Sequence, residues 1–145
     1  LVLIGTLGFT AAAAAHCQVP CGIYDDAARI KGMHEDATTI TKAVTKIGEL
    51  AGKQDAKSIN QATRWILTKE QHASKIIRTV SEYFLTQKIK PAKSGSKGYP
   101  TYLSLLADHH AVMVWAMKAK QGVSSETAAK LHGALRQMGT HWTKP

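Results

Sequence analysis

The sequence predicts an all-α protein, an antiparallel four-helix bundle preceded by a short irregular segment. Apolar residues recur at alternating spacings of three and four along separate stretches, which is the period of helices packed along their length. The connections between these stretches are short and no region is strand-rich, so neighbouring helices should run antiparallel. With 145 residues, of which 44% are hydrophobic, the chain is expected to form a single domain.

The first predicted helix carries an apolar seam with a period near 3.5. The seam consists of Ile30, Met33, Ala37, Ile40, Val44, Ile47 and Ala51. Gly52 and the polar residues up to Lys57 should end this helix. The bundle as a whole is expected to span residues 26–142.

A second helix is expected to open at Ser58, which with Gln61 forms a capping box. Its apolar stripe consists of Ile59, Ala62, Ile66, Ala73, Ile76, Ile77, Val80, Tyr83 and Phe84. The stripe stops near Pro91, and residues 90–100 form a basic loop rich in Gly, Ser and Pro.

A third helix is predicted from about Thr101 to Gln121, and Gly122 should end it. The residues expected on its inner side are Tyr102, Leu106, His109, Met113 and Met117. Ser124 or Ser125 then caps a fourth helix. Its apolar positions repeat the heptad spacing at Ala128, Leu131, Leu135, Met138 and Trp142.

Residues 1–15, LVLIGTLGFTAAAAA, are interpreted as a leader. The stretch is uncharged, and its apolar part is shorter than the roughly 20 residues that span a bilayer. Ala13 and Ala15 satisfy the A-x-A rule for signal-peptide cleavage. We therefore expect a leader-processing protease to remove residues 1–15, which leaves a mature domain of residues 16–145 that begins at His16. The protein should be exported, periplasmic or extracellular, without stable membrane association after cleavage; an organelle lumen is the alternative if residues before Leu1 extend the leader.

The charge balance is strongly basic, with a formal net charge of +9 from 19 Lys and Arg and 10 Asp and Glu. Such a balance fits nucleic acid, an anionic membrane surface or a small anionic substrate. No aromatic stacking platform accompanies the basic loop at residues 90–97, so no nucleic-acid partner is expected.

Metal sites inside the predicted bundle find little support. A carboxylate di-iron centre needs Glu-x-x-His on two helices, and no glutamate here is followed by His at the third position. The bundle histidines share no ligand spacing, and each is interpreted as a core or surface histidine held by ordinary hydrogen bonds. They are His34, His72, His109, His110, His132 and His141.

The only two cysteines, Cys17 and Cys21, stand in the stretch AAAAAHCQVPCGIYDD, residues 11–26. Their spacing matches neither the C-x-x-C of zinc ribbons nor the C-x-x-C-H of c-type haem. Export would allow a disulfide, but this bridge would close a very small loop and stabilise the fold weakly. Metal ligation explains the two cysteines better.

A mature chain that begins His16-Cys17 offers an α-amine, a backbone amide nitrogen that a metal can deprotonate, and a thiolate. Pro20 turns the chain, so that Cys21 can return a second thiolate. Two nitrogens and two sulfurs in a plane suit nickel(II) or copper(II) rather than tetrahedral zinc. The His16 imidazole can reach the axial position, and the anionic donors favour a higher oxidation state. The pattern therefore points to redox chemistry.

The nine residues HCQVPCGIY, residues 16–24, resemble the nickel hook of nickel-dependent superoxide dismutases, His-Cys-x-x-Pro-Cys-Gly-x-Tyr at the mature N-terminus. Every fixed position of that motif matches. The segments TKEQH, SEYFLTQKIKP and AMKAKQ also resemble helical segments of this family, so the resemblance extends along the mature chain.

The resemblance implies an all-α, antiparallel four-helix bundle with an N-terminal metal-binding hook, assembled as a homohexamer. It implies one nickel ion per chain, bound by the His16 amine, the Cys17 amide and the thiolates of Cys17 and Cys21, with the His16 imidazole joining in the oxidised state. Tyr24 is implied to stand beside the open face of the metal, where it orders small ligands and limits access. The implied reaction converts superoxide anion to dioxygen and hydrogen peroxide by nickel(II)/nickel(III) cycling.

Some positions depart from the family pattern. Gln18 stands where an acidic residue is common. The Glu and Arg that hold the axial imidazole in the family fall near Lys31 and His72, so neither is retained, and Arg64 and Glu35 are the candidates to replace them. Because such neighbours tune a ligand's position and basicity, the departures affect redox tuning more than nickel binding.

We therefore expect an exported nickel superoxide dismutase whose positive charge steers its anionic substrate. The main alternative is an exported nickel- or copper-binding helical-bundle protein without turnover. A third reading is a basic interaction module with a Cys17–Cys21 disulfide.

Overall fold

The computed structural model describes residues 25–143, so the predicted leader and hook lie outside the described residues. Residues 25–143 form four α-helices and one π-helical segment. These are α1 (Asp26–Leu50), α2 (Ala56–Arg78), η1 (Thr79–Lys88), α3 (Tyr99–Gln121) and α4 (Ser125–Gly139). The all-α prediction is confirmed, and η1 continues directly from the end of α2. None of the described helices is long and apolar enough to cross a membrane.

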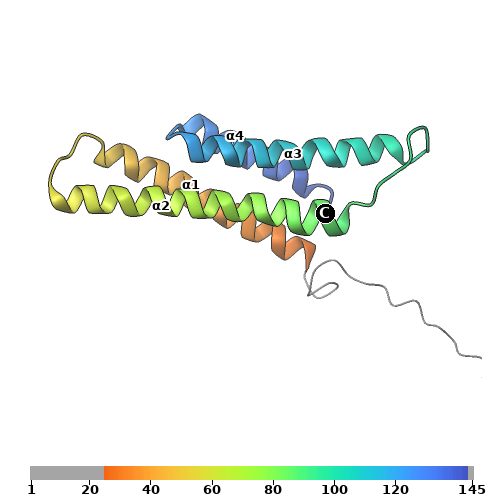
Figure 1. The fold of residues 1–145 in the computed structure, drawn as a ribbon, viewed down its shortest axis with the longest axis horizontal. Coiled ribbons are helices and arrows are strands. Elements are labelled where there is room, and N and C mark those ends of the chain that lie inside the picture. The colour runs from red at the N-terminus through yellow and green to blue at the C-terminus, as the bar shows by residue number, and fades with distance from the viewer. Residues whose placement is uncertain (1–24, 144–145) are drawn as a thin grey trace, which may run out of the picture.

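The helices pack as an antiparallel bundle in which each helix neighbours the next along the chain (Figure 1). Helix α1 contacts α2 and α4, and α3 contacts the same two helices from the opposite side. The core runs along the centre and contains large buried side chains from all five elements, among them Met33, Ile76, Phe84, Val112 and Leu135. Because α1 and α4 are neighbours, the first turns of α1 lie beside the end of the described chain.

The start of α2 differs from the expected capping box at Ser58, and that expectation is wrong. Asp55 is the N-cap, and its carboxylate accepts a hydrogen bond from the Ser58 backbone N–H at 2.9 Å. The helix therefore begins at Ala56. A carboxylate at the N-cap is among the strongest caps available, and hydrogen bonds from Ser58 lower the pKa of Asp55.

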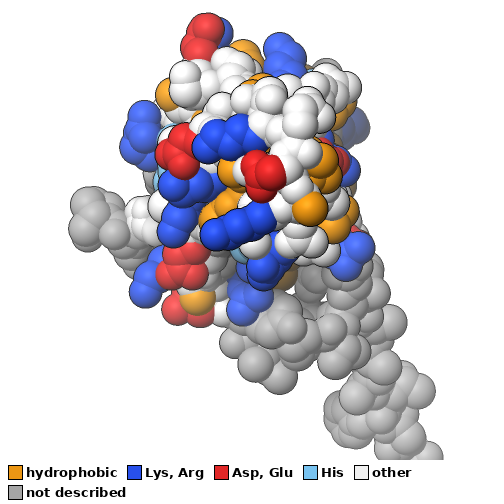
Figure 2. Space-filling view, turned by 90° about the vertical axis from the view of Figure 1, so that its left-hand side faces the viewer, with side chains coloured by type: hydrophobic (Ala, Val, Ile, Leu, Met, Phe, Trp, Pro, Cys, Tyr) orange, Lys and Arg blue, Asp and Glu red, His pale blue; other side chains and the backbone are white. Residues whose placement is uncertain are grey.

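The first half of α2 projects past the end of α3, which exposes part of its predicted apolar stripe. The buried Lys69 ammonium donates hydrogen bonds to the carbonyl of Ala119 at 2.8 Å and to that of Lys120, so α3 ends at the level of Lys69. Beyond this level Ile59 is 50% exposed and Ile66 is 44% exposed, against the expectation that both are core. Figure 2 views the molecule from this end and shows hydrophobic side chains lying open between Lys and Arg side chains.

The buried face of α3 is rotated from the face that the sequence predicts. Its buried residues are His109, Val112, Ala116 and Ala119, whereas Met117 is 42% exposed. Of the five residues expected inside, only His109 is buried. The small side chains of Ala116 and Ala119 let α3 approach its neighbours closely, while the larger Met117 side chain is left partly open to solvent. The prediction for α4 is confirmed for its N-cap, Ser124, and for the buried residues Ala128, Leu131, Leu135 and Met138. The helix ends at Gly139, so Trp142, which was expected on the same helix face, lies beyond it and is partly buried against the core.

Candidate metal centre

The predicted ligands His16, Cys17 and Cys21 and the neighbouring Tyr24 lie outside the described residues. The structure describes the point where this segment joins the bundle. Asp25, the residue bonded to Tyr24, is the N-cap of α1, and its carboxylate accepts hydrogen bonds from the N–H groups of Ala27 at 2.8 Å and Ala28 at 3.4 Å. Residues 16–24 are therefore joined to the described chain at the first turn of α1.

The first residue of α1 is held by the π-helical segment. The Tyr83 hydroxyl donates a hydrogen bond to Asp26 Oδ1 at 2.6 Å, and Lys88 Nζ lies 3.0 Å from Asp26 Oδ2. Neither contact was expected from the sequence. Asp26 followed by helical periodicity is an ordinary helix start, and nothing local in the sequence marks its partners.

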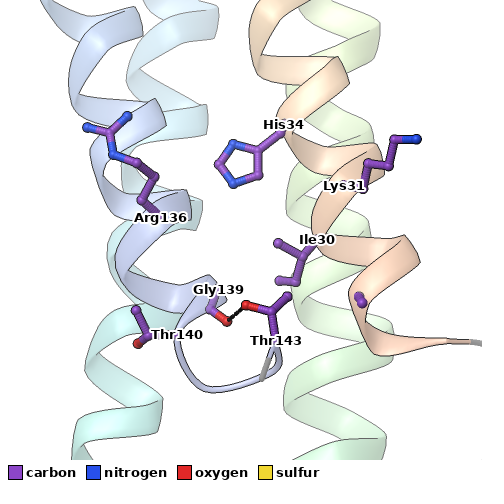
Figure 3. A pocket seen from close by; sticks show the side chains of 8 residues that line it. Ile30, Lys31, His34, Arg136, Gly139, Thr140 and Thr143 are labelled. Atoms are coloured by element: carbon purple, nitrogen blue, oxygen red, sulfur yellow. Dashed lines mark hydrogen bonds between the residues drawn. The ribbon is translucent and has the colours of Figure 1, made fainter. Parts of the chain in front are cut away.

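A cleft of ≈ 720 Å³ opens between the first half of α1 and the C-terminal part of the chain. Its lining includes Lys31 and His34 from α1 and Arg136 and Thr140 from the facing side, and none of the described lining residues carries a carboxylate. Figure 3 shows His34 pointing from α1 toward the helix that carries Arg136, while Lys31 extends away on the other side of α1. Burial lowers the pKa of His34, and the neighbouring His132 and Arg136 lower it further. The charged side chains among the described lining residues, Lys31 and Arg136, are both basic, so this face is suited to small anions.

The two positions that depart from the family pattern lie apart in the structure. Lys31 lines the α1–α4 cleft, whereas His72 faces α1 and places Nδ1 2.7 Å from Oδ1 of the buried Asp36. Lys75 Nζ lies 3.0 Å from the same oxygen. Asp36 was not expected from the sequence. The only feature that marks it there is its place directly before Ala37, a residue of the apolar seam of the first helix. The Asp36 carboxylate orients the imidazole of His72, as it would a histidine in a functional site.

The candidate replacements Glu35 and Arg64 are both exposed. Arg64 precedes His72 by eight residues, about 12 Å of helix, in the direction of the α1–α2 turn. That direction leads away from the first turn of α1. The described structure therefore places Arg64 away from the first turn of α1, while the role of Glu35 stays a prediction.

The buried histidine His109 is fully satisfied without a metal. Its Nδ1 donates to the Leu105 carbonyl at 2.7 Å, and its Nε2 accepts from Trp142 Nε1 at 3.0 Å. Burial lowers the pKa of His109, so the ring is neutral. His110 points outward and is exposed, as expected for adjacent residues on a helix. The interpretation of His109 as a core histidine is confirmed.

Within residues 25–143 no three His, Cys, Asp or Glu side chains are grouped so that they could hold a metal ion. The bundle as described thus offers no rival to the N-terminal donor set. That set, an amine and an amide nitrogen with two thiolates, fits nickel by ligand type and charge.

The sequence model of the nickel-containing superoxide dismutase family matches residues 11–144, which include the hook motif and the whole bundle. The chain belongs to this family. No curated protein and no solved structure gives a significant match to it. Family membership makes this chain a nickel superoxide dismutase, an oxidoreductase that acts on superoxide with a nickel cofactor. The alternative of a metal-binding bundle without turnover is not favoured.

Proposed function

We propose that this nickel superoxide dismutase binds one nickel ion per chain at a mature N-terminus that begins at His16. The observation that carries the proposal is the stretch HCQVPCGIY inside the segment that the family model matches. The lack of any other group of ligands among residues 25–143 supports it. Bound there, nickel would supply the redox centre that takes an electron from one superoxide and gives it to a second.

The proposed ligands are the amine and, in the oxidised state, the imidazole of His16, the amide and thiolate of Cys17, and the thiolate of Cys21. Thiolates and an ionised amide are strongly donating ligands, which makes the higher oxidation state of nickel accessible. Tyr24 limits access to the metal and orders small ligands and water beside it. Tyr24 is bonded to Asp25, so its backbone lies next to the capped first turn of α1.

Replacement of one thiolate tests this ligand set. Protein that begins at His16 should take up about one nickel per chain and turn over superoxide, because all four planar donors are present. Cys21→Ser should lose most of the bound nickel and the activity while the bundle stays folded. Ser104→Ala, at an exposed position on α3, is the control. Nickel bound without turnover in the unsubstituted protein would revive the metal-carrier reading, and unchanged nickel binding in Cys21→Ser would overturn the ligand set.

We further propose that residues 1–15 are removed by a leader-processing protease and that the protein is exported to the periplasm or the extracellular space. The uncharged apolar stretch that ends in small residues supports this proposal. The proposed chemistry also requires it, because the nitrogen of His16 is an ordinary amide while Ala15 is attached. Mass spectrometry of the protein recovered from its host should give His16 as the first residue.

We propose that the mature chains assemble as a homohexamer. The resemblance to the family supports this, and so do the apolar side chains exposed at the α1–α2 end of the bundle, which include Ile59, Ile66, Leu67 and Val123. Light scattering after size-exclusion chromatography should give six times the mass of one mature chain. A monomer at micromolar concentration would contradict the proposal.

Superoxide is proposed to approach over the positive face between α1 and α4. The net charge of +9 supports general attraction of the anion, and Arg136 in the cleft, together with Lys31 at its edge, adds positive charge beside the first half of α1. Such fields raise encounter rates by roughly 10 to 10³-fold and weaken as salt screens them.

A further inference from the structure

Asp26 differs from the other first-turn residues of the bundle because partners distant in the sequence hold both of its carboxylate oxygens. Tyr83 donates to Oδ1 at 2.6 Å, and Lys88 Nζ lies 3.0 Å from Oδ2. Helix α1 does not need these contacts in order to begin, since Asp25 already caps it. The contacts therefore do something other than start the helix.

The π-helical geometry of η1 is what brings Tyr83 and Lys88 onto the same carboxylate. Hydrogen bonds between residues five apart mark this segment, including Ile89 N–H to Phe84 O at 2.9 Å and Thr86 Oγ1 to Ser81 O at 2.6 Å. In an α-helix, five residues turn through about 500°, which would leave two such side chains roughly 140° apart. The wider π-turn places them on one side, and Lys88 Nζ also lies 5.9 Å from the centre of the Tyr83 ring.

The chemistry of the three groups suits a fixed contact. Tyr83 is buried, with 9% of its surface exposed, and burial together with the Asp26 carboxylate raises the pKa of Tyr83 to about 12. The phenol is therefore protonated and donates throughout the working range of pH. A hydrogen bond from a phenol and an ion pair on one carboxylate are charge-assisted and directional, so together they fix its orientation.

We propose that Tyr83 and Lys88 are positioning residues for the nickel site: by holding both oxygens of Asp26 they set the place and direction in which the hook leaves the bundle. The inference rests on the proposed hook at residues 16–24. Asp26 lies five residues after Cys21, so a shift of the first turn of α1 is passed along a short stretch of backbone toward the ligands. π-Helical turns occur frequently at functional sites, and η1 serves the site through its two contacts with Asp26.

The test uses nickel-reconstituted protein that begins at His16, with the variant Tyr83→Phe, the variant Lys88→Gln and the double variant. Tyr102→Phe on α3 and Lys46→Gln, which breaks the exposed ion pair with Glu49 on α1, are the matched controls. Three quantities are measured: the rate of nickel loss to EDTA, the electron paramagnetic resonance spectrum of the oxidised protein, and amide hydrogen exchange at residues 27–30 in the metal-free protein.

The double variant should lose nickel about tenfold faster than the controls, in line with the effect of removing groups that orient metal ligands. Its spectrum should change, and exchange at residues 27–30 should accelerate, while the thermal midpoint of the metal-free protein stays with that of the controls. Lys88→Arg, which keeps the ion pair, should restore most of the nickel retention in the Lys88 series.

Nickel loss and a spectrum indistinguishable from those of the controls would overturn the positioning role while leaving the proposed hook intact. Faster nickel loss accompanied by an equal fall in the thermal midpoint would also overturn it, because the contacts would then be general stabilisation. If the unsubstituted protein takes up no nickel, the proposed hook itself is wrong and the positioning role falls with it. The exchange rates would then report only whether Asp26 is anchored.

Discussion

The two ends of the bundle use similar side chains in different ways. At the end where α1 begins, aromatic and polar groups are enclosed and paired: the Phe84 and Trp142 rings lie 4.9 Å apart, and the Trp142 indole donates to His109. At the end where α1 turns into α2, Ile59 and Ile66 are about half exposed. Both ends follow the same helical period in the sequence. What separates them is the stagger of the helices, which leaves α2 without α3 beside it at one end.

This difference indicates which end of the molecule must be rigid. The family's metal-binding segment joins the chain at the first turn of α1, where Tyr83 and Lys88 hold Asp26. Substitutions of corresponding residues at the two ends test this difference.

The largest contrast is expected between Phe84→Ala and Ile59→Ala. Phe84 is fully buried, and its truncation should lower the free energy of unfolding by about 3–5 kcal/mol through lost burial and the cavity left behind. Ile59→Ala should change it by less than about 0.5 kcal/mol if the face is open to solvent in the monomer. Urea denaturation of dilute metal-free protein measures both. Equal losses of unfolding free energy would mean that Ile59, at the α1–α2 end, is buried rather than open to solvent.

A smaller effect is expected from His109 as the pH falls. Burial lowers the pKa of His109 in the folded state, so the unfolded chain takes up its proton first, near pH 6.5. The stability that the neutral ring contributes is complete above that pH and is lost as the pH falls toward the lower folded pKa, at up to about 1.4 kcal/mol per pH unit.

His109→Gln, which can still donate to Leu105 and accept from Trp142, should reduce this slope in unfolding curves taken between pH 7 and pH 5. A part of the slope should remain, because burial, His132 and Arg136 also lower the pKa of His34. An unchanged slope in His109→Gln would show that the ring does not titrate with unfolding. A matched change at the exposed His110 should have no effect.

The smallest effect is expected from charge reversal beside the cleft. Arg136→Glu combined with Lys31→Glu should lower kcat/KM for superoxide several-fold at low salt, because the encounter of an anion with a positive face depends on that field. The gap should close as ionic strength rises. Lys53→Glu combined with Lys57→Glu, two exposed positions beyond the far end of α1, is the control matched in charge. A loss equal to that of the control, or one insensitive to salt, would exclude steering by this face.

The sequence predicted the fold class and the regular parts of the bundle well. Four residues of α4 are buried as expected, because each is apolar and they follow one uninterrupted heptad spacing. These are Ala128, Leu131, Leu135 and Met138. On α3 the prediction favoured large residues, yet Ala116 and Ala119 are buried and Met117 is exposed. Close approach of helices selects small residues there, and a pattern of apolar positions alone does not rank them.

Features that depend on the packing of distant segments were not accessible from the sequence. The exposure of Ile66 follows from the stagger between α2 and α3. The contacts of Tyr83 and Lys88 with Asp26 follow from a π-helical stretch that no local pattern marks. The candidate metal site is the opposite case. Its proposed ligands are neighbours in the chain, so the motif from His16 to Tyr24 predicts the donor set from residue order alone, without reference to the fold.

The requirement for a free amine on His16 is tested most directly by the nickel content and superoxide turnover of two forms of the chain. One form begins at His16, and the other retains residues 1–15. Both forms contain the same bundle and the same cysteines, and they differ in whether His16 has a free amine. About one nickel per chain and full turnover are expected in the first form, with both lost in the second. Equal nickel content and equal activity in the two forms would show that the site does not need the His16 amine.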